Sequence, residues 1–315
     1  MELQRYKILF SGFIILSLLV LTTFLFVGGP ISAEDRLQKM FWEMGHFFLF
    51  AIATFSLFTL TNLGKRPLLF KLLFTLVFCV VFGFGTEYAQ LLVGRNFELK
   101  DVLHDFVGGF SGLTLSLFSL KNKRLVNLGI CIIVFVGTVF GCRDFLLALW
   151  DEYRINKDFP VLADFESGIE LKRWRISGGH FELSEDNATS GENSLKVDFR
   201  PARYSDLSMD HFASNWVGYN YLTFNIESSA EQPINLYVKI YDYTHYYSAF
   251  RFYDRFNGKI LVNPGNNKIR INLEDVRNAP RDRPMLLNEV WGVSIFAIDL
   301  KEPYRFYLDD VRLEK

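Results

Sequence analysis

Residues 83–112 read GFGTEYAQLLVGRNFELKDVLHDFVGGFSG, and this stretch decides the fold of the N-terminal half. Glycine and polar residues recur in it at i, i+4, i+7 and i+11, first as Gly83, Glu87, Gln90 and Gly94 and then as Asp101, Asp105, Gly108 and Gly112. Each set lies on one face of a helix. The surrounding residues are apolar, and glycine lets helices approach closely in a membrane. The stretch therefore predicts two closely packed helices that carry a polar seam.

Apolar sequence continues on both sides of this stretch. Five segments, roughly 8–28, 41–62, 68–93, 102–120 and 126–149, each approach the ~20 residues that cross a bilayer. Lysine and arginine cluster at Arg5 and Lys7, at Lys65, Arg66 and Lys71, and at Lys121, Lys123 and Arg124. Because such charges mark the cytoplasmic side, we expect the N-terminus inside and the C-terminal half outside the cytoplasm. The alternative for the first segment is a signal peptide cleaved near Ser32-Ala33.

Charge divides the chain into two halves. Residues 1–150 carry 13 Lys and Arg against 9 Asp and Glu, whereas residues 151–315 carry 21 against 26. This asymmetry predicts a membrane domain over 1–150, a polar linker over 151–160 and a soluble domain over 161–315. The chain has no long basic run, so no nucleic-acid partner is expected. All three cysteines lie in apolar segments, and they do not define a redox compartment.

Polar residues from separate apolar segments are expected at one depth of the helical bundle. Alternating span directions bring them to its extracytoplasmic end. The candidate site residues are His46, Glu87, Gln90, Arg95, Asp101 and Asp105. A carboxylate in apolar surroundings is costly unless it is paired or hydrated, so these residues predict a functional site.

The run from Glu87 to Gly108 resembles the signature of the VanZ-like membrane protein family, which is named for a teicoplanin-resistance accessory protein. The matching positions are Glu87, Gln90, Arg95, Asp101, Gly108 and Gly112, with His46 in the preceding helix. Asp105 departs from the pattern, because the family usually has Asn there, and the usual Asp-Lys pair before the histidine is absent. The resemblance covers roughly residues 35–120. It implies a multi-pass protein of the bacterial inner membrane with an envelope role, in the context of glycopeptide antibiotic resistance.

Three interpretations of the polar residues stay open. They can join helices by hydrogen bonds and have a structural role only. Paired carboxylates beside a histidine can instead perform general acid–base catalysis on a lipid-linked substrate, and a variant of this interpretation places a divalent metal between Glu, Asp and His. The third interpretation is binding or transport of an envelope lipid or glycopeptide.

From about residue 161 the hydrophobic pattern changes to period two, which is typical of strands. Leu195, Val197 and Phe199, for example, alternate with Lys196 and Asp198. Many such runs, separated by turn residues, predict an all-β sandwich of jelly-roll type. The segments 163–168, 190–195 and 306–313 also resemble galactose-binding-like, carbohydrate-binding jelly rolls. This resemblance implies the same fold, and its motifs define that fold better than they define a ligand.

One predicted strand, residues 236–243, carries a row of tyrosines on the face away from the core. The candidate glycan-binding residues there and just beyond are Tyr237, Tyr241, Tyr243, His245 and Tyr246. Aromatic rings with polar tips can stack on sugar rings and hydrogen-bond to hydroxyls. The alternatives are that this face packs against the membrane bundle, a loop or another subunit, or that its aromatic residues have no function.

Acidic residues near the two ends of the predicted sandwich suggest one cofactor, a structural Ca²⁺ ion, because calcium prefers oxygen ligands. The candidate ligands are Asp164, Glu166, Asp309 and Asp310. The alternative is that at least two of them are solvated or cap turns.

The sequence therefore predicts an α-helical membrane bundle of about five spans followed by an extracytoplasmic β-sandwich. Its expected partners are the lipid bilayer and a glycan or glycolipid of the cell envelope, which the sandwich binds or handles. The alternative is a membrane enzyme that acts on a lipid-linked saccharide through His46, Glu87, Asp101 and Asp105.

Overall fold

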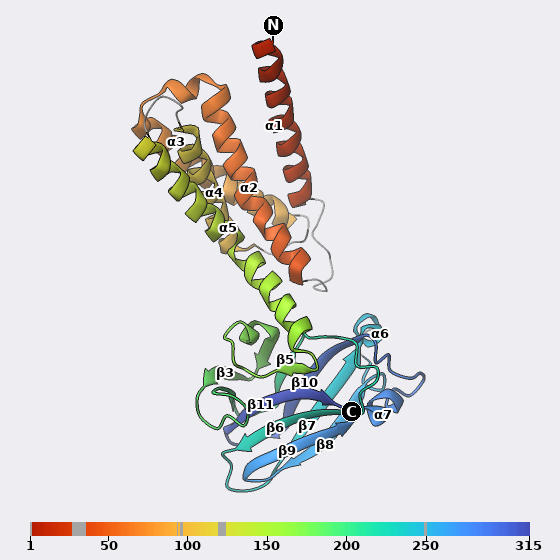
Figure 1. Ribbon diagram of the computed structural model, residues 1–315. Helices are drawn as coiled ribbons and strands as arrows, with labels where there is room; N and C mark the ends of the chain where they lie inside the picture. Colours follow the sequence, from red (N-terminus) through yellow and green to blue (C-terminus); the bar gives the residue numbers. More distant parts are fainter. Residues whose placement is uncertain (1, 27–35, 93, 95–96, 119–123, 249–250) are drawn as a thin grey trace. The chain divides into compact units, whose positions relative to one another are not determined.

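The computed structural model describes residues 2–26, 36–92, 94, 97–118, 124–248 and 251–315 of the chain. The chain divides into two compact units, Met1–Trp150 and Asp151–Lys315. The first unit is helical and the second is built mainly from β-strands (Figure 1).

Five α-helices form the described part of the first unit. They are α1 (Glu2–Phe26), α2 (Arg36–Leu60), α3 (Leu68–Leu92), α4 (Leu99–Ser116) and α5 (Arg124–Asp158), with a short 3-10 helix, η1 (Asn62–Lys65), after α2. Each α-helix overlaps one of the five predicted apolar segments. Among the described residues, α2, α3 and α5 are long and apolar enough to cross a bilayer. That a membrane surrounds the unit, and that it contains five spans, stay predictions.

Glycines set the distance between α4 and its neighbours. A Cβ at Gly108 would overlap the backbone oxygen of Phe47 in α2, and Gly112 meets the backbone of α2 in the same way. Glycine was expected to bring the two helices of residues 83–112 together, whereas Gly108 and Gly112 face α2 instead. Gly83 of α3 does face α4, where its Cβ would lie 3.0 Å from Asp105 Oδ2. Both contacts allow polar side chains of three helices to meet.

The second unit consists of strands joined by turns and short helices. Its strands are β1 (Val161–Ala163), β2 (Trp174–Ser177), β3 (Gly179–Ser184), β4 (Ser194–Phe199), β5 (Ala202–Met209), β6 (Tyr221–Ser228), β7 (Ile234–Asp242), β8 (Phe256–Val262), β9 (Gly265–Asn272), β10 (Val290–Leu300) and β11 (Tyr304–Glu314). Its short helices are η2 (Glu170–Arg173), α6 (Tyr243–Tyr247) and α7 (Leu273–Asn278).

The strands form two antiparallel sheets. Sheet A has the strand order β3-β4-β11-β6-β9, with β1 beside β11, and sheet B has the order β2-β5-β10-β7-β8. One hydrophobic core takes side chains from both sheets, including Phe224 and Phe306 of sheet A and Leu207 and Val238 of sheet B. The prediction of an all-β sandwich is therefore confirmed.

The last turns of α5 belong to the second unit. Because α5 extends through Asp158, most of the segment 151–160, predicted as a linker, is helical. Arg173 donates from Nε and Nη2 to Asp151 Oδ1, at 3.1 and 2.7 Å, and from Nη1 to the backbone oxygen of Leu162 at 2.9 Å. This buried ion pair joins the helix end to the sandwich.

Candidate functional site

The helical unit brings five of the six predicted polar site residues together. These five, the polar cluster, are His46 of α2, Glu87 and Gln90 of α3, and Asp101 and Asp105 of α4. Each is no more than 3% exposed. The sixth residue, Arg95, lies outside the described residues. The i, i+3 spacing of Glu87 and Gln90 and the i, i+4 spacing of Asp101 and Asp105 explain why the two polar side chains of α3, and those of α4, point the same way.

His46 lies at the centre of the polar cluster. Its Nδ1 is 3.1 Å from Asp105 Oδ1. Its Nε2 is 3.5 Å from Asp101 Oδ2, 3.8 Å from Glu87 Oε1 and 3.4 Å from Gln90 Nε2. The imidazole therefore has a carboxylate near each of its two nitrogens. Such an arrangement can orient the ring through one nitrogen and leave the other for proton transfer or ligand binding.

Three carboxylate oxygens of the polar cluster have no hydrogen-bond partner in the described part of the chain. They are Glu87 Oε1, Asp101 Oδ1 and Asp105 Oδ2. The other oxygen of Glu87 accepts a hydrogen bond from the backbone N–H of Glu98 at 2.8 Å. Within the described salt bridges, these three carboxylates pair with His46 alone. One imidazole cannot neutralise three buried carboxylates, so among the described residues the cluster has more negative than positive charge.

A separate group of charges surrounds Lys100 near the start of α4. Its Nζ donates to Glu43 Oε2 of α2 at 2.7 Å and lies 2.6 Å from Asp144 Oδ2 of α5. Lys100 therefore links three helices beside the polar cluster. Sequence reasoning missed this residue, because it lies in the connection just before the predicted apolar segment 102–120.

Sheet B carries an aromatic surface on the side away from the core. Tyr237 and Tyr241 of β7 face outward, as the alternation predicts, because Val238 and Ile240, the alternate residues, lie in the core. The ring of Phe296 in β10 stacks on Tyr237, with centroids 5.4 Å apart, and lies 5.1 Å from the ring of Tyr204 in β5. The ring of Tyr241 occupies the space above Gly292, where any Cβ would overlap it. We call Tyr204, Tyr237, Tyr241 and Phe296 the aromatic face.

Charged side chains stand on the same side of sheet B. Lys239 Nζ lies 4.0 Å from Asp206 Oδ1, which also accepts a hydrogen bond from the Tyr204 hydroxyl at 3.2 Å. Asp210 pairs with Arg175. Burial raises the pKa of Asp206 and lowers the pKa of Lys239. Both groups are thus partly desolvated, and a ligand that hydrogen-bonds to them would favour their charged forms.

The remaining residues of the predicted glycan site lie elsewhere. The strand ends at Asp242, whose Oδ1 accepts the backbone N–H of His245 at 2.9 Å and so begins helix α6. Tyr243 and Tyr246 therefore lie on α6 and pack against Trp291, with centroids 5.3 and 5.5 Å away. His245 is fully buried. The prediction that the strand extends to Tyr243 was wrong by one residue, because a capped helix begins there.

The four predicted calcium ligands do not form a ligand group in the described structure. Their oxygens serve neighbouring loops and side chains instead. Glu166 Oε1 accepts the backbone N–H groups of Glu192 and Asn193, and Asp309 Oδ2 accepts those of Thr189 and Ser190. Asp164 Oδ1 accepts the backbone N–H of Glu166, and Asp310 pairs with Arg312. Asp164, Glu166 and Asp309 thus accept backbone N–H groups of turns, as the alternative to calcium binding expected of at least two of the four.

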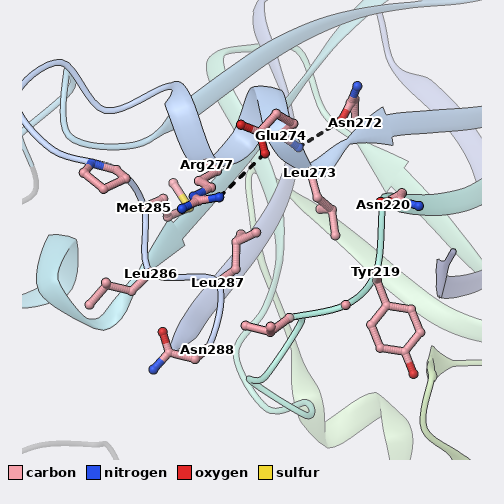
Figure 2. Close-up of a pocket in the computed structure, with 13 residues that line it drawn as sticks. Tyr219, Asn220, Asn272, Leu273, Glu274, Arg277, Met285, Leu286, Leu287 and Asn288 are labelled. Atoms are coloured by element: carbon pink, nitrogen blue, oxygen red, sulfur yellow. Dashed lines mark hydrogen bonds and ion pairs between the residues drawn. The ribbon is translucent and has the colours of Figure 1, made fainter.

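A cavity of about 460 Å³ opens beside α7, and sequence reasoning did not find it. Its lining comes from three segments, 217–220, 272–277 and 284–288 (Figure 2). Asn272 Oδ1 accepts the backbone N–H of Glu274 at 2.9 Å, and Arg277 pairs with Glu274 at 3.9 Å. These polar groups thus already form a hydrogen bond or an ion pair that supports α7. No spacing rule predicts such a cavity, because the segment 217–220 is distant in sequence from the other two.

No protein-family model matches the chain, and a search of curated proteins gives no match. Among solved structures, the chain is similar to an exo-beta-agarase, with 12% identity and a TM-score of 0.38 over 49% of this chain and 25% of that one. It is also similar to the family 11 carbohydrate-binding module from Clostridium thermocellum, in complex with a beta-1,3-1,4-mixed-linked tetrasaccharide, with 14% identity and a TM-score of 0.38. A carbohydrate-binding module specific for non-crystalline cellulose gives 16% identity and a TM-score of 0.36.

The lengths of these similar proteins differ. The chain spans about a quarter of the length of the agarase. In contrast, the matched part, about half of this chain, covers 94% of each of the two carbohydrate-binding modules.

Proposed function

We propose that the sandwich binds a glycan on the aromatic face of sheet B. The observation that carries this proposal is the row of rings on three neighbouring strands, Tyr204 of β5 and Tyr237 of β7 on either side of the buried ring of Phe296 in β10. A sugar ring presents C–H groups on its faces and hydroxyls around its edge. Aromatic rings with a few hydrogen-bonding groups beside them are therefore its natural counterpart.

The charged groups next to the rings supply the polar part of such a site. Asp206 accepts hydrogen bonds and Lys239 donates them, and both stand on the outward side of sheet B. Their partial burial makes each hydrogen bond to a sugar hydroxyl more favourable than it would be in open solvent. Tyr204 is 43% exposed, so its ring is available to a ligand.

Two single substitutions test this proposal. Tyr204→Ala and Tyr237→Ala should each weaken glycan binding about tenfold or more, because each removes one ring of the row. The measurement is a glycan array with the full chain in detergent micelles, followed by calorimetric titration of the best ligand.

The matched control is Tyr221→Ala. Tyr221 lies on β6, next to the core residue Leu222, and so faces outward from sheet A. Its removal should leave glycan binding unchanged. The proposal is wrong if the Tyr221 variant loses as much affinity as the other two, or if both aromatic-face variants bind like the unmodified chain with unchanged melting temperatures.

We also propose that the helical unit is a VanZ-like, multi-pass anchor in a bacterial inner membrane, with its N-terminus in the cytoplasm and the sandwich outside. Two observations support this. Helices α2, α3 and α5 are long and apolar enough to cross a bilayer. The distribution of Lys and Arg between the connections favours this orientation. The glycan would then belong to the cell envelope.

A second candidate function is a membrane enzyme that acts on a lipid-linked saccharide. The observation that favours it is the convergence of His46 with three buried carboxylates. In addition, an apolar cavity of about 460 Å³, lined by Leu37, Gln38, Phe41, Trp42 and Phe145, lies toward the same end of α2 as His46. General acid–base catalysis at the polar cluster would act on a substrate whose lipid part occupies apolar surroundings.

A further inference from the structure

We propose that the polar cluster is a binding site for one divalent transition-metal ion, held by His46 Nε2, Glu87 and Asp101. This proposal does not rest on glycan binding by the sandwich, because every residue of the cluster belongs to the helical unit. It gives a chemical reason for three helices to contribute buried polar groups to one point.

The distances between the three ligand atoms fit a shared ion. One ligand atom from each residue lies within 4.8 Å of the other two. His46 Nε2 is 3.5 Å from Asp101 Oδ2 and 3.8 Å from Glu87 Oε1. Two ligands at about 2.0–2.1 Å from one tetrahedral Zn²⁺ are separated by about 3.3–3.4 Å. Binding thus requires only a small contraction of the cluster.

Asp105 prepares His46 for this role. Its Oδ1 lies 3.1 Å from His46 Nδ1, so this nitrogen carries the proton and donates it to the carboxylate. Nε2 is then unprotonated and accepts the N–H of Gln90 at 3.4 Å, with Asp101 and Glu87 at 3.5 and 3.8 Å, so a metal ion would take the place of Gln90 as its partner. A carboxylate that accepts the second N–H of a metal-binding histidine is a recurring support, because it fixes the ring and its tautomer.

The charges of the cluster favour a cation. Glu87 Oε1 and Asp101 Oδ1 are buried without a hydrogen-bond partner among the described residues. The nearby cation Lys100 is already engaged by Glu43 and Asp144. A divalent ion would neutralise both metal-binding carboxylates and remove the cost of burying them.

The ligand types select the class of metal. An imidazole nitrogen disfavours Mg²⁺ and Ca²⁺, which prefer oxygen ligands, and suits Zn²⁺ and similar transition metals. Two carboxylates and one imidazole also leave the fourth tetrahedral position for water, substrate or the nearby Gln90. Three protein ligands with an open position are typical of catalytic rather than structural zinc sites.

The test uses the full chain in detergent, stripped with a chelator, incubated with Zn²⁺ and desalted. Mass spectrometry should find about one Zn²⁺ per chain. Glu87→Gln and Asp101→Asn, which keep the size of each side chain, should each lose most of this zinc. Asp105→Asn should still bind it, but roughly 10–100-fold more weakly, because it acts through His46.

The matched control is Asp144→Asn, which removes a carboxylate that pairs with Lys100 outside the polar cluster. It should keep its zinc. Added Zn²⁺ should raise the melting temperature of the unmodified chain, a measurement that does not depend on any variant folding. The proposal is overturned if the unmodified chain takes up no zinc and shows no thermal shift, or if the Glu87 and Asp101 variants keep the full zinc content.

Discussion

At the scale of single residues, Gly108 controls how closely α4 approaches α2. A Cβ at this position would overlap the backbone oxygen of Phe47, and a backbone atom cannot move aside as a flexible side chain can. We expect Gly108→Ala to force the helices apart and to cost about 1–3 kcal/mol or more. The measurement is the melting temperature of the full chain in detergent.

The matched control is Gly85→Ala in α3, where a new Cβ would meet nothing within 4 Å. Because alanine favours helix more than glycine does, this variant should be as stable as the unmodified chain or slightly more so. If Gly108→Ala also melts at the same temperature as the unmodified chain, the helices α2 and α4 are not in close contact at Gly108.

The spacing of residues in the sequence predicts which residues share one face of a helix better than it predicts which other helix packs against that face. The i, i+4 pattern correctly placed Asp101, Asp105 and Gly108 on one side of α4, and that side is buried. It did not reveal that Gly108 faces α2, because a helical period contains no information about which helix lies opposite. Lys100 was missed for the same reason, since its partners lie on two other helices.

At the scale of elements, Asp242 ends β7 and positions α6. Its carboxylate accepts hydrogen bonds from Arg283 Nη2 at 2.7 Å and from the backbone N–H of Leu286 at 2.8 Å. Asp242→Asn keeps the size and the helix cap but removes the charge opposite Arg283. We expect the sandwich to lose roughly 1–3 kcal/mol, measured by chemical unfolding at neutral pH. Asp282→Asn, an exposed neighbour in the same loop, should have little effect.

The lowered pKa of Asp242 also predicts how the stability of the sandwich depends on pH. Burial raises the pKa of Asp242, but hydrogen bonds from Arg283, Leu286 and His245 outweigh it, so the pKa lies below its usual range. Because its pKa is lower in the folded state than in the unfolded state, ionised Asp242 stabilises the fold. This stabilisation is complete above about pH 4 and is lost as the pH falls through the folded-state pKa. Unmodified chain should therefore lose stability in acid, and Asp242→Asn should lose less. Equal losses in both would exclude Asp242 as the cause.

At the scale of the whole molecule, the alternating pattern was enough to predict the sandwich but not its strand order. Tyr237 and Tyr241 could be placed on an outward face because alternation within one strand defines its two sides. Tyr204, Asp206 and Phe296 were missed, because they lie beside β7 only through the order β5-β10-β7. Pairing between distant strands depends on the complete packed structure, and a single strand contains no signal for it.

The end of α5 determines which fragment of the chain can fold alone. Arg173 is 4% exposed, and its guanidinium is bound by the fully buried Asp151. Arg154 lies 3.3 Å from Glu170, so a second ion pair joins the same helix turns to the sandwich. A fragment 160–315 lacks both helix residues and leaves Arg173 unpaired. Breaking a buried pair in this way costs about 3–5 kcal/mol.

We therefore expect fragment 151–315 to be soluble and to unfold cooperatively, with a β-type circular dichroism spectrum, while fragment 160–315 is much less stable or aggregates. Within the longer fragment, Asp151→Asn should lower the melting temperature by several degrees, because it removes the charge opposite Arg173. Glu152→Gln, the exposed next residue, is the matched control and should melt like the parent fragment. Equal melting temperatures for both fragments would show that the sandwich is stable without α5 and that residues 151–158 are dispensable.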